Sequence, residues 1–300
     1  MEEHERLDVL LEERGAMINL AYRMLGSLAE AEDAVQEAYV RWYALAPESQ
    51  AQIDSPGAWL TTVVSRICLD QLGSARARRE RYVGEWLPEP LPGSIDVTEG
   101  RLGSAEDPAD RITLDESVDT AFLVVLESMT PAERVAFLLH DVFRYPFEEI
   151  AAIVGRTPAA CRKLASSARG RVRDARPLPG PAPEQAEVVR SFREAWTSHD
   201  VAALVSLLDP AAVAVADGGG RVAASLAPVV GGTEIATYLV GLAERAGSIT
   251  LLDRTVNGRP GLLATYDDEV VAVYSFEIAE DRIQRIWVVR NPEKLRGWNT

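Results

Sequence analysis

Residues 146–173 carry the pattern that most constrains this chain: a helix, a tight turn and a second helix that is basic. Pro146 followed by two acids is typical of a helix N-terminus, because proline suits the first turn and acids offset the helix dipole. Gly155 is expected to end that helix, since glycine enters the left-handed conformation without steric cost. Thr157 is placed to cap the helix that follows. This layout is typical of a helix-turn-helix, whose second helix enters the DNA major groove.

The second helix supplies the surface that would face DNA. Its basic side chains stand against one acid, Asp174. The predicted DNA-facing residues of this helix and of the turn before it are Arg156, Thr157, Ala159, Arg162, Lys163, Ser166 and Arg169. The other interpretation is a surface helical hairpin with a solvated basic face, because helical hairpins are common. The rest of the chain has to decide between the two.

Charge is unevenly distributed along the chain. The formal net charge is −15, which argues against a simple nucleic-acid binder. Yet arginines cluster at 76–81 and in the basic helix, while residues 85–119 between them are strongly acidic. Local fields rather than net charge decide where a polyanion can dock. The basic segments can therefore bind nucleic acid, and the acidic remainder can meet a basic protein partner.

Composition excludes several classes of protein. With 300 residues, of which 47% are hydrophobic and 26% charged, the chain is globular and long enough for two or three domains. No apolar run approaches the length of a membrane span, and the acidic N-terminus is not that of a signal peptide. Cys68 and Cys161 are too few for a disulfide framework or a zinc cluster, so we expect no metal, no cofactor and a cytoplasmic location.

The first part of the chain, from about residue 7 to 82, is expected to be helical. One helix is predicted at about 29–44, a polar loop at 47–57, and a further helix that starts at Pro56 and ends in the arginine cluster. The polar face of the 29–44 helix consists of Asp33, Gln36, Glu37 and Arg41. Taken alone, such a face is usually solvated.

Two modules, in this order, resemble a known family. Segments 33–38 and 56–70 resemble conserved region 2 of the extracytoplasmic-function sigma factors of bacterial RNA polymerase, and residues 115–175 resemble region 4. The motifs that carry the resemblance are Asp33-Ala34-Val35-Gln36-Glu37-Ala38, Pro56-Gly57-Ala58-Trp59-Leu60 and Ser128-Met129-Thr130-Pro131-Ala132-Glu133-Arg134. Ser65-Arg66 stands where the commonest family pattern has Arg-Asn, so a minus-10 sequence preference is not carried over.

The resemblance implies a promoter-specificity subunit that binds core RNA polymerase and promoter DNA. Its helix-turn-helix would read minus-35 duplex DNA, and the polar face defined above would bind the clamp helices of the beta-prime subunit, with the beta subunit as a second contact. The first domain would help to open the minus-10 element, where basic side chains supply affinity for phosphates. The predicted minus-10 residues are Arg66, Asp70, Arg76, Arg78 and Arg79. Trp59 could stack on a base, but its helical spacing with Val63 and Ile67 favours the core.

A stiff segment follows the first domain. Residues 85–90 are rich in proline and therefore extended. Trp86 and Leu87 are costly to leave exposed, which predicts that they dock on a domain. Residues 92–108 are rich in glycine, proline and acids and are expected to be flexible. Residues 177–183 form a second, proline-rich boundary.

After this boundary the pattern changes from helices to strands. Asp217 to Arg221 is a hairpin signal. Segments that alternate like antiparallel strands are 249–256, 261–266, 270–278 and 283–289, and the turns between them are predicted at Asn257-Gly258, Asp267-Asp268 and Glu280-Asp281. Helices followed by such a meander make an α+β cone. This arrangement resembles the nuclear-transport-factor-2 or SnoaL-like fold.

Short motifs connect this last domain to the stiff segment. Residues 86–90, 217–220 and 291–295 resemble motifs of the sigma-factor subgroup that has a C-terminal SnoaL-like extension, although aspartate is usual where Glu293 stands. A glycine turn permits close backbone approach, and the last motif has one apolar anchor, Leu295. The predicted interdomain regulatory residues are Trp86, Leu87, Pro88, Asp217, Gly218, Gly219, Gly220, Asn291, Pro292 and Leu295.

The predicted architecture is multidomain: two all-α sigma domains followed by an α+β, cone-shaped SnoaL-like domain. The predicted segments are 1–82 (region 2), 83–114 (acidic linker), 115–176 (region 4), 177–183 (proline-rich linker) and 184–300 (regulatory domain). The expected function is that of a sigma factor regulated in cis by its last domain, without enzymatic activity. The alternative is a helix-turn-helix regulator whose last domain senses an unknown small molecule or catalyses a reaction through Asp217, His199 or Asp200.

Overall fold

The structure, a computed structural model, describes residues 3–79, 82–93, 119–175, 182–222, 224–225, 227–246 and 249–299. The chain forms two compact units. Among the described residues, the helical unit comprises residues 3–78 and 125–175, and the sheet unit comprises residues 79, 82–93, 119–124 and those from 182 onward. Residues 94–118 and 177–181, which hold most of both predicted linkers and the first residues of predicted region 4, lie outside the described residues.

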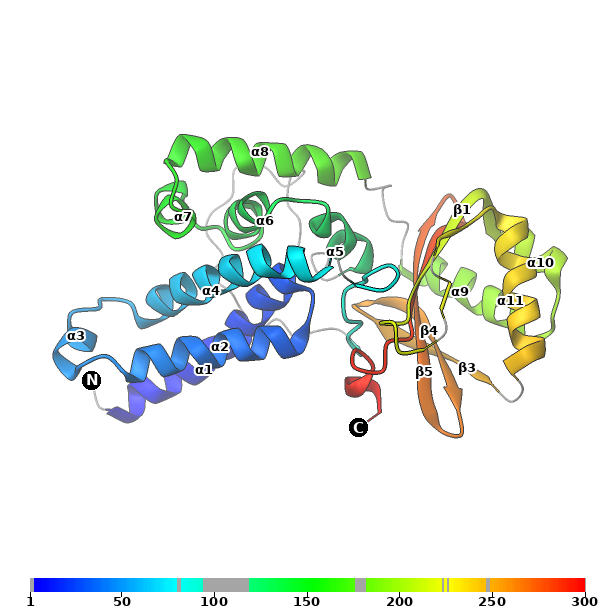
Figure 1. Cartoon of the computed structure of the whole chain (residues 1–300), viewed down its shortest axis with the longest axis horizontal. Coiled ribbons are helices and arrows are strands. Elements are labelled where there is room, and N and C mark those ends of the chain that lie inside the picture. Colours follow the sequence, from blue (N-terminus) through cyan, green and yellow to red (C-terminus); the bar gives the residue numbers. More distant parts are fainter. Residues whose placement is uncertain are drawn as a thin grey trace. The chain divides into compact units, whose positions relative to one another are not determined.

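Four helices open the helical unit (Figure 1). Gly26, with a φ of 71°, makes a sharp turn, and Ser27 caps the second helix by accepting the Glu30 N–H. The segment 47–57, predicted to be a polar loop, contains a short helix that begins at Pro47, because proline suits the first position of a helix. The helices are α1 (Glu3–Leu25), α2 (Leu28–Tyr43), α3 (Pro47–Ala51) and α4 (Pro56–Arg79).

The predicted helix-turn-helix is present in the same unit. Gly155 ends its first helix with a φ of 69°, and the Thr157 hydroxyl accepts the Ala160 N–H at 3.2 Å where the second begins. Thr130 and Glu133 form a capping box one helix earlier. The elements are α5 (Thr120–Glu127), α6 (Pro131–Phe137), the π-helix η3 (Leu138–Val142), α7 (Phe147–Val154) and α8 (Pro158–Ala175).

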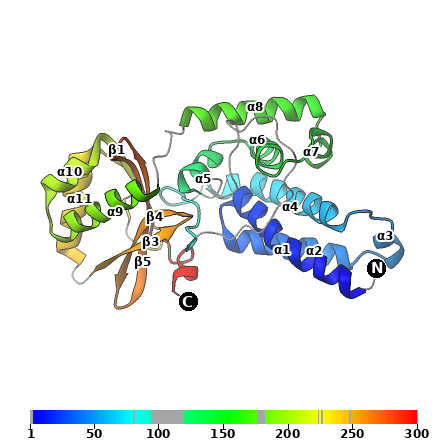
Figure 2. The same ribbon diagram turned by 180° about the vertical axis from the view of Figure 1, so that it is seen from behind.

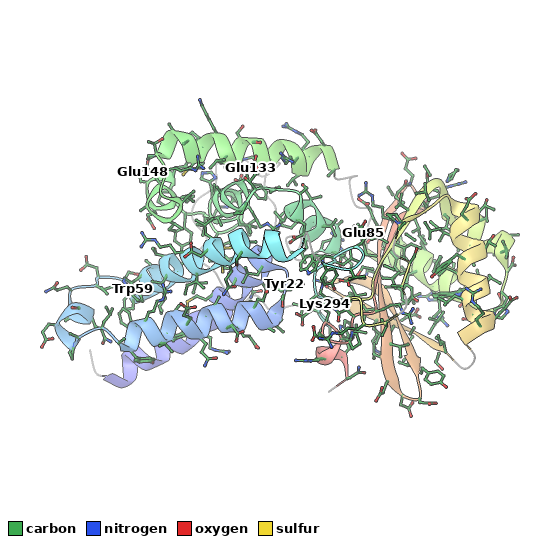
Figure 3. All side chains as sticks on the ribbon, in the orientation of Figure 1. Tyr22, Trp59, Glu85, Glu133, Glu148 and Lys294 are labelled. Atoms are coloured by element: carbon green, nitrogen blue, oxygen red, sulfur yellow. The ribbon has the colours of Figure 1, made fainter. Side chains whose placement is uncertain are left out.

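The buried arginine Arg134 joins these two groups of helices. Its side chain donates to the Met24 carbonyl at the end of α1 at 2.8 Å and pairs with Glu127 at 2.7 Å. Tyr22, two residues before Met24, is also buried in this core (Figure 3). A buried charge is stable only when paired, so this arginine holds α6 against α1. Helices α1–α4 and α6–α8 therefore belong to a single packed unit.

The sheet unit has a six-stranded sheet with three helices on one face (Figures 1 and 2). The strand order is β2-β1-β6-β5-β4-β3, and neighbours are antiparallel except β1 and β6, which run parallel. The helices are α9 (Ala182–Thr197), α10 (Val201–Leu207), α11 (Gly232–Ala246) and the 3-10 helix η4 (Arg296–Trp298). The strands are β1 (Leu208–Asp217), β2 (Val229–Val230), β3 (Thr250–Val256), β4 (Arg259–Tyr266), β5 (Glu269–Ala279) and β6 (Arg282–Val289).

Both faces of this sheet are covered by apolar side chains. Against the helices, Phe192 contacts Trp196 and Phe276 edge to face, with ring centroids 6.0 and 5.3 Å apart. On the other face a second cluster contains Leu87 and Leu295. Helices followed by a strand meander confirm the predicted α+β architecture. The second cluster also shows that a residue of the stiff segment and a residue of the last motif complete this face.

The turn after β1 differs from the prediction. Residues 217–221 were expected to close a hairpin, but β2 begins only at Val229 and pairs with Val213 and Ala214 in the middle of β1. Gly219 and Gly220 have φ values of 65° and 67°. The turn that they form brings the Gly219 N–H onto the Asp217 carboxylate and does not pair the following residues with β1 as a hairpin would. The turns predicted between the later strands are confirmed at Asn257-Gly258, Asp267-Asp268 and Glu280-Asp281, all with positive φ.

Candidate functional site

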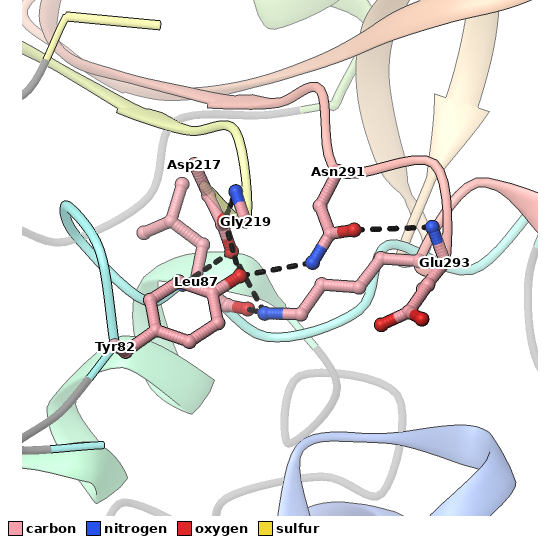
Figure 4. A network of polar contacts seen from close by, with 7 residues as sticks. Tyr82, Leu87, Asp217, Gly219, Asn291 and Glu293 are labelled. Carbon is pink, nitrogen blue, oxygen red and sulfur yellow. Dashed lines mark hydrogen bonds and ion pairs between the residues drawn. The ribbon is translucent and has the colours of Figure 1, made fainter. Parts of the chain in front are cut away.

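A buried carboxylate stands at the end of β1. Asp217 is fully buried, and its Oδ1 accepts the Tyr82 hydroxyl at 2.6 Å and the Gly219 N–H at 2.9 Å (Figure 4). Its Oδ2 accepts the Leu87 N–H at 3.0 Å and the Lys294 ammonium at 2.7 Å. One carboxylate thus contacts Tyr82, the stiff segment at Leu87 and the last motif at Lys294. We call Tyr82, Trp86, Leu87, Asp217, Asn291 and Lys294 the Asp217 cluster.

Lys294 is the cation of this cluster, and sequence reasoning missed it. Its side chain is 10% exposed, and its ammonium also donates to the Leu87 carbonyl. The ammonium lies 4.0 Å from the centroid of the Trp86 ring and 5.5 Å from that of Tyr82, so two aromatic faces stabilise the charge. The sequence held a signal for it. A buried aspartate needs a cation, and Lys294 is the basic residue of the 291–295 motif, which was predicted to act together with the 217–220 motif.

Tyr82 links the two motifs through its hydroxyl. The hydroxyl donates to Asp217 and accepts the Asn291 side-chain amide at 2.9 Å, while the Asn291 Oδ1 accepts the Glu293 N–H (Figure 4). Burial and the hydrogen bond to the Asp217 carboxylate raise the pKa of Tyr82. The phenol therefore stays protonated and keeps its role as donor at physiological pH.

The glycines after Asp217 are required by close approach. A Cβ on Gly219 would lie 2.5 Å from Cγ of Asn291, and a Cβ on Gly220 would lie 3.0 Å from Cβ of Val83. Both glycines also have positive φ. The backbone thus approaches other segments closely at two positions. Gly219 approaches Asn291 of the last motif, and Gly220 approaches Val83, shortly before the stiff segment.

Apolar contacts complete the docking of the stiff segment. Leu87 and Leu295 are buried together on the sheet, and the Trp298 indole donates to the Pro90 carbonyl at 2.8 Å. Pro88 is buried, whereas Pro292, one of the predicted regulatory residues, is exposed. The predicted docking of Trp86 and Leu87 is therefore present, and the regulatory role of these residues stays a prediction.

The polar face of α2 is exposed as expected. Asp33, Gln36 and Glu37 point away from the core, and Arg41 pairs with Glu37 one turn earlier. Two further residues, Val40 and Tyr43, are apolar yet 62% and 59% exposed. The sequence contained the signal, because positions 40 and 43 are out of phase with the buried positions 35, 38 and 42. The face thus continues from acidic to apolar along the helix.

The predicted DNA-facing residues lie on the outer side of α8 and its preceding turn. All seven are exposed, while Cys161, Ala165, Ala168 and Val172 form the buried side. Arg169 pairs with Asp141 of the π-helix at 2.6 Å, and the Arg162 guanidinium lies 5.0 Å from the centroid of the Phe147 ring. These contacts orient two arginines without removing them from solvent.

The predicted minus-10 residues are described only in part. Arg66 and Asp70 are exposed on α4, and the Arg66 guanidinium donates to the Ala152 carbonyl of α7 at 2.9 Å. The side chains of Arg76, Arg78 and Arg79 lie outside the described residues. Trp59 meets Trp42 of α2 edge to face at 5.3 Å (Figure 3). That contact supports a packing role for Trp59.

Two of the three acid/base candidates, Asp200 and Asp217, are engaged in structural hydrogen bonds, and the third is exposed. Asp200 caps α10 by accepting the Ala203 N–H at 2.9 Å, and Asp217 is engaged as described. His199 is exposed in a left-handed turn with a φ of 57°. Among the described residues, no group of three or more His, Cys, Asp or Glu side chains is placed to hold a metal ion. No described helix is both long and apolar enough to cross a membrane.

Comparison with known proteins identifies relatives that match most of this chain. Residues 10–78 match sigma-70 region 2, and residues 120–172 match sigma-70 region 4. The chain is 36% identical to the ECF RNA polymerase sigma factor SigJ of Mycobacterium tuberculosis, over 95% of this chain and 91% of that protein. It is 35% identical to a probable ECF RNA polymerase sigma factor, SigI, of the same species, over 94% and 92% of the two chains.

The solved structures include a relative that matches both units. The crystal structure of Mycobacterium tuberculosis SigJ matches with a TM-score of 0.73 and 33% identity, over 98% of this chain and 99% of that chain. The match therefore extends over region 2, region 4 and the C-terminal α+β domain of this chain. The chain belongs to the extracytoplasmic-function sigma factors of RNA polymerase, with a SnoaL-like domain after region 4.

Proposed function

We propose that the C-terminal domain regulates this sigma factor in cis by holding the segment that joins region 2 to region 4. The observation that carries the proposal is the buried Asp217–Lys294 pair closed around the Leu87 backbone. A buried ion pair forms in one geometry only, so it defines a docked and an undocked state of the segment. Regulation then consists of shifting the population between the two states.

Within the helical unit, residues of region 2 contact residues of region 4. Arg66, a predicted minus-10 contact, donates to Ala152 of the helix-turn-helix, and Arg134 joins α6 to α1. An arginine that is hydrogen-bonded to protein has to leave that partner before it can contact a phosphate. We therefore assign this arrangement to the resting state of the free protein, and we expect it to open on promoter DNA in the cytoplasm.

We further propose that the exposed face of α2 binds the beta-prime clamp of core polymerase, with region 4 meeting the beta subunit. The acidic residues would pair with basic side chains of the partner, while Val40 and Tyr43 would supply the apolar centre that binding interfaces need. A small-molecule ligand of the C-terminal domain stays a prediction.

Loss of apolar side chains from this face is expected to weaken binding of core polymerase. Val40→Asp and Tyr43→Ala should each lower the affinity by roughly tenfold, because each removes buried apolar area from the complex. The measurement is co-purification with purified core polymerase followed by titration. Tyr266→Ala is the matched control, since Tyr266 is 47% exposed on the sheet unit. Equal losses in all three variants would refute the assignment of the face.

Loss of basic side chains from α8 is expected to weaken promoter binding. A phosphate contact removed by Arg162→Ala or Lys163→Ala should flatten the salt dependence by about one unit, whereas a bidentate base contact should cost roughly 1–3 kcal/mol at one position. Run-off transcription and a salt series with core polymerase check this. Arg190→Ala, an exposed arginine of α9, is the control. Normal transcription by both single variants and by the double variant would disprove the proposed DNA-facing surface.

A further inference from the structure

The turn between β3 and β4 contacts Leu91 to Gly93, the residues that follow the stiff segment. The Leu91 N–H donates to the Asn257 side chain and the Asn257 N–H donates to the Leu91 carbonyl, both at 2.9 Å. Gly93 repeats the exchange, since its N–H donates to Thr255 and its carbonyl accepts from Gly258, both at 3.0 Å. These bonds flank an isolated antiparallel bridge between Pro92 and Val256, the last residue of β3. Sequence reasoning assigned Asn257 to a turn only.

The same turn also contacts Asp119, directly before α5. Arg259, the next residue after Gly258, pairs with Asp119 at 3.2 Å, and the side chains are only 21% and 15% exposed. Beside this pair, the Thr120 hydroxyl donates to the Ser275 hydroxyl at 3.1 Å. Ala121 and Val124 of α5 pack on the apolar cluster that contains Leu87. The first turn of region 4 is therefore held on the sheet by polar and apolar contacts.

We propose that the β3–β4 turn, residues 255–259, is a binding surface for both ends of the region 2–region 4 linker. Leu91 to Gly93 occupies one side and Asp119 the other. Gly93 and Asp119, the described residues on either side of residues 94–118, thus both contact this one turn. A stretch of that length could span roughly 80 Å when extended, so fixing both ends at consecutive residues shortens the reach between the two promoter-binding regions.

Binding at one side favours binding at the other. Once the first end is held, the second is at high effective concentration near the turn. The two sides should therefore dissociate cooperatively, and the Asp119–Arg259 pair should stabilise backbone hydrogen bonds in which neither residue takes part. This inference rests on the proposed cis regulation for its biological meaning, but the coupling itself is a property of the free protein.

Hydrogen exchange of the full-length protein tests the coupling. The amides of Leu91 and Gly93 report on the first side. We expect Asp119→Asn to raise their exchange rates by about fivefold, because it removes the charge of a partly buried pair. Asparagine keeps an oxygen for the Ala121 N–H that Asp119 accepts, so helix capping is preserved.

Two further variants complete the experiment. Asn257→Gly removes the acceptor of the Leu91 N–H while tolerating the positive φ of 50°, and it should raise exchange at Leu123, whose N–H donates to the Asp119 carbonyl. Asp253→Asn is the control, because Asp253 lies on β3 away from the turn and pairs with Arg193 of α9. It should leave Leu91, Gly93 and Leu123 unchanged.

The outcomes separate this inference from the proposed function. If Asp119→Asn leaves the Leu91 and Gly93 amides protected, or if Asp253→Asn exposes them equally, the two sides are independent and the inference is wrong. If exchange is coupled as expected while the same variants transcribe like the native protein with core polymerase, the binding surface stands and cis regulation fails. Urea unfolding of each variant excludes general loss of the fold as the cause of faster exchange.

Discussion

Asp217→Ala is expected to release the stiff segment and to destabilise the sheet unit by about 3–5 kcal/mol, because it leaves the buried Lys294 ammonium without its counter-charge. The variant also removes the acceptor of the Tyr82 hydroxyl and of the Leu87 and Gly219 amides. Urea unfolding measures the loss of stability, and exchange of the Leu87 amide measures release of the segment. Run-off transcription should rise at limiting sigma factor.

A double-mutant cycle shows whether the pair itself is responsible. Lys294→Met should destabilise less than Asp217→Ala, and the double variant should lose less than the sum of the single variants, because it contains no unpaired buried charge. Arg221 and Glu293 form an ion pair at 2.6 Å beside the cluster, but their side chains are 60% and 50% exposed. Glu293→Ala is thus the control, with a loss of less than about 1 kcal/mol. Additive losses in the cycle would contradict the assigned coupling.

Removal of residues 291–300 is expected to increase transcription, whereas removal of residues 182–300 is expected to increase it less or to lower it. The shorter deletion removes Asn291, Lys294 and Leu295 from the contacts with the stiff segment and leaves all six strands. The longer deletion also uncovers Ala121 and Val124 of α5, so the first helix of region 4 loses apolar packing. The two truncations should therefore differ in effect.

Run-off transcription with core polymerase measures both truncations against the full-length chain. Small-angle scattering of the free proteins should show their sigma regions less restrained. Far-UV circular dichroism controls for the fold of the shorter deletion, whose strands should be retained. Transcription at the level of the full-length chain by both proteins would mean that the C-terminal domain is no regulator in cis, and would reopen the sensor and enzyme hypotheses for it.

The sequence predicted those features whose physical cause lies in a few neighbouring residues. Gly155 and Thr157 define the turn of the helix-turn-helix through backbone conformation and capping, which are properties of a few neighbouring residues. The docking of Trp86 and Leu87 was predictable for a similar reason, because apolar side chains on a linker are costly to expose. In each case the physical cause lies within the segment itself.

The partners of distant segments were not predictable in this way. Lys294 meets Leu87, and Arg134 meets Met24, only because tertiary packing brings them together. The parallel pairing of β1 with β6 likewise joins strands that are separated by the rest of the meander. A hairpin signal at Asp217 failed because the glycines there serve contacts with Asn291 and Val83, which the sequence does not encode locally.

Because β6 follows β1–β5 in the sequence, the parallel pairing of β1 with β6 can form only late in synthesis. Asp217 lies opposite Val289 on β6, and its counter-ion Lys294 follows a few residues later. A nascent chain emerges and folds from its N-terminal end, so region 2 and region 4 are made before β6 can pair with β1. Each newly made molecule therefore passes through a period in which region 2 and region 4 are complete and the Asp217–Lys294 contact that we propose restrains them has not yet formed. In a cell that makes this protein in bursts, the youngest molecules would be the least restrained.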